Sequence, residues 1–133
     1  MAYTIEQGPS GVFRLRAFGP GNLAEGQASI DALRAAAAPV ARPRVLVDIR
    51  ELEYIPAPAE ARILANLYSA FSRAHRARIA FLAPPGAEYG VARMVSIIAE
   101  LGGATTGAFT DEGDALRWLE AEAGGAAQQS DAS

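Results

Sequence analysis

The residues of this chain that could do chemistry are few, and they lie far apart in the sequence. Asp48 stands near the end of an otherwise apolar run, where burial can raise the pKa of a carboxyl group toward that of a catalytic base. Such a residue more often accepts backbone hydrogen bonds from a neighbouring loop or pairs with an arginine. We expect this structural role for Asp48.

The only histidine, His75, follows Ser72 by three residues near the predicted end of a helix. A general base needs a nucleophile and an orienting acid, and no acid stands nearby in the sequence. Cysteine and lysine are both absent, which excludes thiolate metal sites, Schiff bases and a phosphate-loop lysine. We therefore expect a protein that is not an enzyme and uses neither a metal ion nor a cofactor.

A ligand-binding arrangement is conceivable where three polar residues precede or open predicted helices. Tyr89 and Arg93 stand one helical turn apart after a P-P-G sequence, and arginine is well suited to clamp a carboxylate or phosphate. Asn22 ends a G-P-G-N loop that could offer backbone N–H groups to an anion. The alternatives are that Tyr89 packs at the sheet edge, that Arg93 is solvated or paired with an acidic residue, and that the G-P-G-N loop only forms a turn.

A protein-binding surface is conceivable in the segment R-E-L-E-Y-I-P. Tyr54 and Ile55 would place apolar side chains in a loop, where they could anchor a partner. The alternative is that Ile55 folds down over the core. The charged residues expected around this anchor are Arg50, Glu51, Glu53 and Arg62.

Length and composition limit the other functions. A chain of 133 residues with 50% hydrophobic content is long enough for one domain with a sizeable core. A net charge of −3 argues against a nucleic-acid surface, and no apolar run approaches the ~18 residues of a membrane span. Glu6, Gly8 and Pro9 stand where a signal peptide would need apolar residues, so we expect a soluble, cytoplasmic protein.

Hydrophobic periodicity predicts a single α/β domain over residues 1–123, followed by a mobile polar tail over residues 124–133. The predicted order is ββαβαβαβα, which implies a five-stranded, mostly parallel sheet with an antiparallel edge strand and four helices. Exposed positions in the first two strands also permit a homodimer, formed through the sheet edge or through the exposed helices. The clearest segments are strands at 3–7, 12–18 and 44–49 and helices at 59–75 and 88–101.

Four details of the helices follow from spacing. Asn22 is expected to cap the first helix, with Glu25 as its reciprocal partner in a capping box. Ile63, Leu67 and Phe71 are expected on the buried face of the helix at 59–75. Apolar spacing likewise places Leu101 on the buried stripe of the helix at 88–101, and Trp118 is expected to cover the sheet.

Three passages resemble a known family: R-V-L-V-D-I-R at Arg44–Arg50, Y-G-V-A-R-M at Tyr89–Met94 and F-T-D-E-G-D-A-L-R-W-L at Phe109–Leu119. With the element order, residues 2–120 resemble the SpoIIAA-like group of the STAS superfamily, which includes anti-sigma-factor antagonists. The resemblance implies a β-α fold with sequential strands and a regulatory role through contact with another protein.

Phosphorylated members of that superfamily carry a serine or threonine at the start of the helix after the strand that corresponds to residues 44–49. Here that place reads I-P-A-P-A-E-A, and neither residue type occurs between Glu51 and Tyr68. We therefore expect an interaction module without the usual phosphoswitch, which binds another protein through the Tyr54 loop. The alternative is a domain that binds a small apolar or anionic ligand near Asn22, Tyr89 and Arg93.

Overall fold

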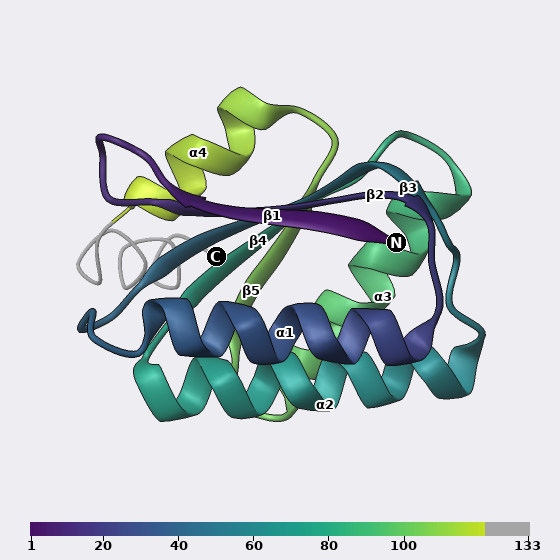
Figure 1. Cartoon of the computed structure of the whole chain (residues 1–133), viewed down its shortest axis with the longest axis horizontal. Coiled ribbons are helices and arrows are strands. Elements are labelled where there is room, and N and C mark those ends of the chain that lie inside the picture. The colour runs from purple at the N-terminus through teal and green to yellow at the C-terminus, as the bar shows by residue number, and fades with distance from the viewer. Residues whose placement is uncertain (122–133) are drawn as a thin grey trace, which may run out of the picture.

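The computed structural model describes residues 1–121, and it shows a five-stranded sheet with helices on both faces (Figure 1). The order of elements confirms the predicted ββαβαβαβα pattern. The predicted tail at 124–133 lies outside the described residues. The elements are β1 (Ala2–Gln7), β2 (Phe13–Pro20), α1 (Leu23–Ala37), β3 (Arg44–Glu53), α2 (Pro58–His75), β4 (Arg78–Leu82), α3 (Ala87–Leu101), β5 (Thr105–Phe109) and α4 (Glu112–Glu120).

The strands lie in the sheet in the order in which they occur in the chain, β1-β2-β3-β4-β5. β1 runs antiparallel to β2, and the other neighbours are parallel, which confirms the predicted antiparallel edge strand. Figure 1 shows α1, α2 and α3 on one side of the sheet and α4 on the other. We call these two sides the three-helix face and the α4 face.

Each face of the sheet has its own core. On the three-helix face, strand residues such as Val45 and Val47 pack with Leu33 and Phe71 of the helices. On the α4 face, Leu46 and its neighbours pack with the buried side chains of α4. Successive residues of a strand point to opposite faces, so apolar runs in the central strands serve both cores.

A β-bulge in β3 changes which side chains reach which face. β2 and β3 stay in register until Arg16 lies opposite Asp48, and pairing resumes with Phe18 opposite Glu51. Two residues of β2 thus match three of β3, and the extra residue shifts the alternation. The strand continues to Glu53, so the predicted strand end at residue 49 was wrong.

The helix ends confirm one cap and correct one. The side chain of Asn22 accepts a hydrogen bond from the Glu25 N–H at 2.9 Å, as expected of an N-cap. The predicted capping box is wrong, because the Glu25 carboxylate pairs instead with the Met1 amine at 2.7 Å.

Two predicted positions on buried helix faces are also corrected. Ile63 is 40% exposed, because the buried face of α2 is centred on Leu64 and Tyr68, and each helix residue turns by about 100°. Leu101 is 84% exposed. It follows buried Ala99 by two residues and so points to the opposite side of α3.

Candidate functional site

An apolar pocket of about 90 Å³ opens between the sheet and the helices of the three-helix face. It lies at the carboxyl end of β3, where the loop at Tyr54, Ile55 and Pro56 forms part of its wall. Ligands of open α/β sheets commonly bind at these strand ends. The deeper wall comes from β2 and β3, α1, α2 and α3 and includes Leu15, Val47, Leu64, Tyr68, Phe81 and Val95.

The pocket exists because small residues occupy core-facing positions. Ala17 of β2, Gly26 and Ser29 of α1, and Ala92 of α3 all line it, where larger residues would fill the space. A Cβ atom on Gly26 would already lie 3.2 Å from the Leu64 side chain. The Ser29 hydroxyl donates to the Gly26 carbonyl at 2.7 Å, so it does not need a partner in the pocket.

Tyr54 is a residue of the pocket wall, and its hydroxyl is buried. The oxygen makes no hydrogen bond of ordinary geometry among residues 1–121, but the Glu60 carboxylate lies near enough to act as its acceptor. Burial, then the negative charge of Glu60 and hydrogen bonding to it, raise the pKa of Tyr54 to about 12. The hydroxyl therefore stays protonated at neutral pH. Burial also raises the pKa of Tyr68, the other tyrosine in the wall.

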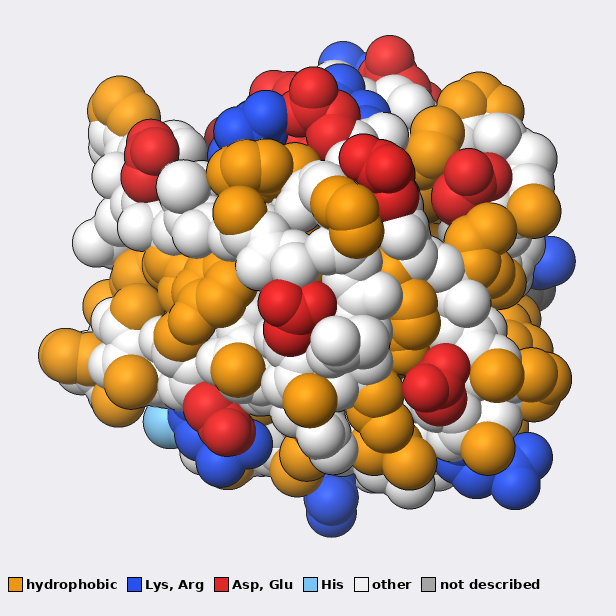
Figure 2. Space-filling model, turned by 45° about the vertical axis from the view of Figure 1, so that its right-hand side comes forward, with side chains coloured by type: hydrophobic (Ala, Val, Ile, Leu, Met, Phe, Trp, Pro, Cys, Tyr) orange, Lys and Arg blue, Asp and Glu red, His pale blue; other side chains and the backbone are white. Residues whose placement is uncertain are grey.

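The bulge in β3 determines which side chains of the strand form this pocket wall. Leu52 and Tyr54 both line the pocket on the three-helix face, whereas Glu51 pairs with Arg16 on the α4 face. Ile55 follows at the pocket and is 51% exposed, which places it at the mouth and does not support its alternative role as a core lid. Figure 2 brings this end of the molecule forward and shows hydrophobic side chains at the surface with acidic groups among them.

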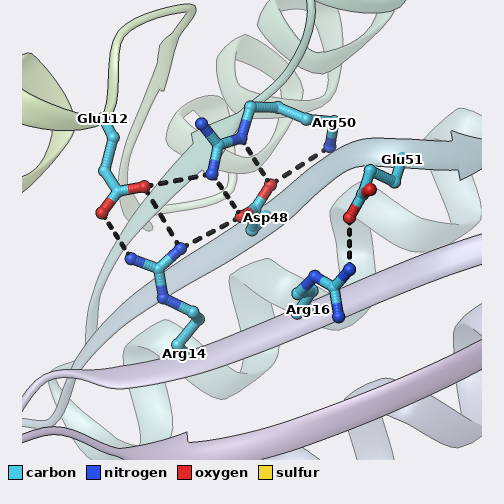
Figure 3. A network of polar contacts seen from close by, with 6 residues as sticks. All are labelled: Arg14, Arg16, Asp48, Arg50, Glu51 and Glu112. Atoms are coloured by element: carbon cyan, nitrogen blue, oxygen red, sulfur yellow. Dashed lines mark hydrogen bonds and ion pairs between the residues drawn. The ribbon is translucent and has the colours of Figure 1, made fainter.

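On the α4 face, the bulge is held by a network of ion pairs (Figure 3). Asp48 accepts hydrogen bonds from Arg14 Nη1 at 3.0 Å and from the backbone N–H, Nε and Nη2 of Arg50 at 3.2, 3.0 and 2.8 Å. Glu112, at the start of α4, accepts from Arg14 Nη2 at 2.6 Å and from Arg50 Nη2 at 3.0 Å. The network therefore joins β2, β3 and α4.

The electrostatics of this network make Asp48 a structural anion. Burial alone would raise the pKa of Asp48, but the Arg50 hydrogen bonds and the charges of Arg50 and Arg14 lower it below the ordinary value. Hydrogen bonds from Arg14 likewise lower the pKa of Glu112, and its contact with Asp48 raises the pKa of Arg50. The predicted pairing of Asp48 with an arginine is confirmed.

The structure divides the residues predicted to bind a partner. Tyr54 and Ile55 lie at the pocket, whereas Arg50 is held by Asp48 and Glu112 on the α4 face. Glu53 is exposed at the end of β3, and Arg62 is exposed on α2. Arg50 is therefore not part of a charged rim around Tyr54. That Arg50, Glu53, Tyr54, Ile55 and Arg62 bind a partner stays a prediction.

The residues predicted to bind a ligand do not line the pocket. The Asn22 side chain caps α1, Tyr89 packs partly buried against the core of the three-helix face, and Arg93 is exposed on α3. Their neighbours Glu88 and Val91 line the pocket instead. Ligand binding by Asn22, Tyr89 and Arg93 also stays a prediction.

The other candidate residues have structural contacts. The His75 ring lies 5.2 Å from that of Phe71, and the Ser72 hydroxyl donates to the Ala77 carbonyl at 2.8 Å. Trp118 packs against the core of the α4 face as expected, with the Arg78 guanidinium 4.0 Å from its ring centre.

Within residues 1–121, no three His, Cys, Asp or Glu side chains come together as a metal site would require. In the same region, no helix combines the length and apolarity of a membrane span.

Sequence reasoning missed the small residues that create the pocket and the partners of Asp48. Ala17, Gly26 and Ala92 occupy core-facing positions where large apolar residues are usual, and this contrast was the available signal. Arg14 and Glu112 are separated by 98 residues, so only the fold brings them together.

Comparisons with known proteins identify the fold. No protein-family model matches the sequence, and no curated protein matches it. A solved structure that is similar is an uncharacterized protein of the DUF3478 family with a SpoIIAA-like fold from Shewanella loihica PV-4. The two chains share 20% sequence identity with a TM-score of 0.56, over 89% of this chain and 92% of the other. This chain therefore has a SpoIIAA-like fold, as the sequence resemblance predicted.

Proposed function

We propose that this protein is a non-enzymatic binding domain whose pocket receives the apolar part of a small molecule. The observation that carries the proposal is the pocket of about 90 Å³ with its almost wholly apolar wall. An apolar cavity of about 150 Å³ in another protein takes up benzene or xenon. This pocket accordingly suits a short alkyl chain or the edge of a single ring, and the open mouth at Ile55 lets a longer ligand extend outward.

The Tyr54 hydroxyl adds no free donor to the proposed site, because the Glu60 carboxylate already lies near it. The favoured ligand is therefore an apolar molecule, and a polar group that it carries stays at the open mouth of the pocket.

Several contacts support a role without catalysis. Asp48 is ionised and bound by two arginines on the α4 face, which is the face opposite the pocket. The Ser72 hydroxyl donates to one backbone group and accepts from another, so it is not free to act as a nucleophile.

The test is a series of primary alcohols from 1-butanol to 1-octanol, titrated into the protein and followed by NMR chemical shifts. Each buried methylene contributes about 0.8 kcal/mol, so the affinity should rise about fourfold per carbon until the pocket is filled. Ala92→Leu places a larger side chain in the pocket and should abolish this rise. Ala70→Leu, on the exposed side of α2, is the matched control and should leave it unchanged.

Two outcomes would contradict the proposal. The first is an affinity that does not depend on chain length in the unmodified protein. The second is an equal affinity in Ala92→Leu and Ala70→Leu, measured on variants that melt cooperatively.

A second candidate function is regulatory binding of another protein through the pocket mouth. Ile55, 51% exposed, and Ile63, 40% exposed, place apolar surface near the start of α2. A partner could insert one apolar side chain into the pocket beside Ile55. Affinity capture with Ile55→Glu should lose such a partner, and Ile97→Glu, on a residue of α3 that is 43% exposed and lies outside the pocket, should retain it. A partner captured equally by both variants would exclude this surface.

A further inference from the structure

We propose that one end of this protein binds peripherally to a membrane surface that carries anionic phospholipids. The surface consists of five arginines around the amino ends of β3 and β4, and we call it the basic end: Arg42, Arg44, Arg73, Arg76 and Arg78. Figure 1 shows the connections from α1 to β3 and from α2 to β4, around which these arginines lie, together at the left of the molecule. The pocket lies at the carboxyl end of β3, so the proposal does not depend on the proposed pocket function.

Two short segments of the same pattern bring four of the arginines together. The segment R-P-R at 42–44 leads into β3, and the segment R-A-R at 76–78 leads into β4. Arg44 and Arg78 are direct partners in the register of the two strands, and the Arg78 N–H donates to the Pro43 carbonyl at 2.9 Å. The two segments therefore lie side by side, as neighbouring strands about 4.8 Å apart do. Arg73 adds a fifth positive charge from the last turn of α2.

No acidic side chain of residues 1–121 forms an ion pair with the basic end. In this part of the chain, every ion pair that contains an arginine involves one of the other arginines Arg14, Arg16, Arg34, Arg50 and Arg117. Like charges directly opposite each other on neighbouring strands destabilise a sheet. Arg44 and Arg78 donate to the Ser10 and Trp118 carbonyls at 3.0 and 2.9 Å, but these neutral groups do not remove the charge. The basic end therefore keeps its positive charge for an anionic partner.

Two of the five arginines stand where the backbone favours glycine. Arg42 and Arg76 have φ angles of 52° and 54°, in the left-handed region that residues with a Cβ atom adopt at a cost in free energy. The dipole of α2 favours a cation at Arg76, which caps that helix, but α1 already ends at Ala37 and so does not explain Arg42. The chain thus keeps exposed positive charges where glycine would fit better, which indicates a role for them beyond the fold.

The residues among these arginines suit a bilayer better than a nucleic acid. The neighbouring side chains that reach the surface are small and apolar: Ala38, Pro39, Val40, Ala41 and Ala74. Such side chains can enter the interface of a bilayer while guanidinium groups bind the lipid phosphates. The Trp118 ring could otherwise stack on a base, but the Arg78 guanidinium already lies 4.0 Å from its centre. The net charge of −3 also favours contact through one end only.

Vesicle binding of the full chain tests the proposal. Trp118 is the only tryptophan and lies beside Arg78, so energy transfer from Trp118 to dansyl-labelled lipid reports contact at the basic end. The protein should bind vesicles of phosphatidylcholine mixed with phosphatidylserine, and it should not bind vesicles of phosphatidylcholine alone. Binding should be lost at an ionic strength of about 1 M, where the Debye length falls to about 3 Å.

The double variant Arg42→Gly with Arg76→Gly removes two charges without straining the backbone. Each arginine near an anionic surface strengthens binding by about fivefold, so this variant should bind about 25-fold more weakly. Its melting temperature should not fall, because glycine adopts a positive φ without steric cost. Arg16→Gln with Arg93→Gln is the matched control. It lowers the net charge equally at other places on the surface and should change the affinity by less than about twofold.

Three outcomes would overturn the proposal. The first is the absence of binding to vesicles that contain phosphatidylserine. The second is an equal loss of affinity in the two double variants. The third is tighter binding to a DNA duplex or to inorganic phosphate than to these vesicles, at the same ionic strength and the same total concentration of phosphate groups.

Discussion

Asp48→Asn tests how the α4-face network holds the bulge of β3. Asn keeps the shape of the side chain but removes the charge that binds Arg14 and Arg50. The Asp48 side chain is 6% exposed, whereas those of its two arginines are 33% and 41% exposed. Hydrogen bonds to charged groups are worth about 1.5–3 kcal/mol each when buried. Water and Glu112 can still accept hydrogen bonds from the two arginines. We therefore expect a total loss of only about 2–3 kcal/mol in the free energy of unfolding.

The assay is urea denaturation of the variant and of Asp114→Asn, the matched control. Asp114 pairs with Arg117 on the surface of α4, where both side chains are mostly exposed, so its loss should cost about 0–0.5 kcal/mol. Equal losses in the two variants would refute the structural role of the network.

The pH dependence of the stability of Asp48→Asn provides a second test of the network. The pKa of Asp48 is lowered in the folded protein, so its stabilising effect is complete above the unfolded value and disappears as the pH falls through the folded value. The stability difference between the unmodified protein and Asp48→Asn should therefore be largest near neutral pH and should shrink below pH 3.8. A difference that grows on acidification would contradict this assignment of the charge.

Two further substitutions follow from the geometry. Gly102→Ala should lower the free energy of unfolding by about 1–3 kcal/mol, because the added Cβ would lie 2.5 Å from the Ser69 hydroxyl oxygen; Gly90→Ala, with open space around it in α3, should instead stabilise by up to about 1 kcal/mol in the same denaturation assay. In an ultraviolet absorbance titration, Tyr54→Phe should remove one phenol that ionises near pH 12, and a phenol lost near pH 10 would show that Tyr54 is not buried in solution.

The fold could be predicted from the sequence because each element carries its own local signal. The β-branched run at 44–49 and the helix stop at Gly102 depend on residues next to each other in the chain. The side chain of Asn22 likewise forms its cap with a residue three positions away.

The site could be predicted only in part, because it depends on contacts between distant segments. The sequence pointed to the Tyr54 loop, but it placed Arg50 beside Tyr54 because a regular alternation hides the bulge. The bulge depends on Arg14 of β2, Glu112 of α4 and Asp48, which meet only in the folded sheet. The pocket depends on the small size of Gly26 and Ala92, whose position facing the core becomes evident only when the faces of their helices are known.

The most direct test of the binding function is a crystal of the protein equilibrated under xenon pressure. Xenon enters small apolar cavities that accept hydrocarbon groups. The pocket predicts a xenon atom among Ala17, Tyr68 and Ala92, and its loss in Ala92→Leu. Crystals of the unmodified protein without xenon at this place would contradict the proposed apolar site.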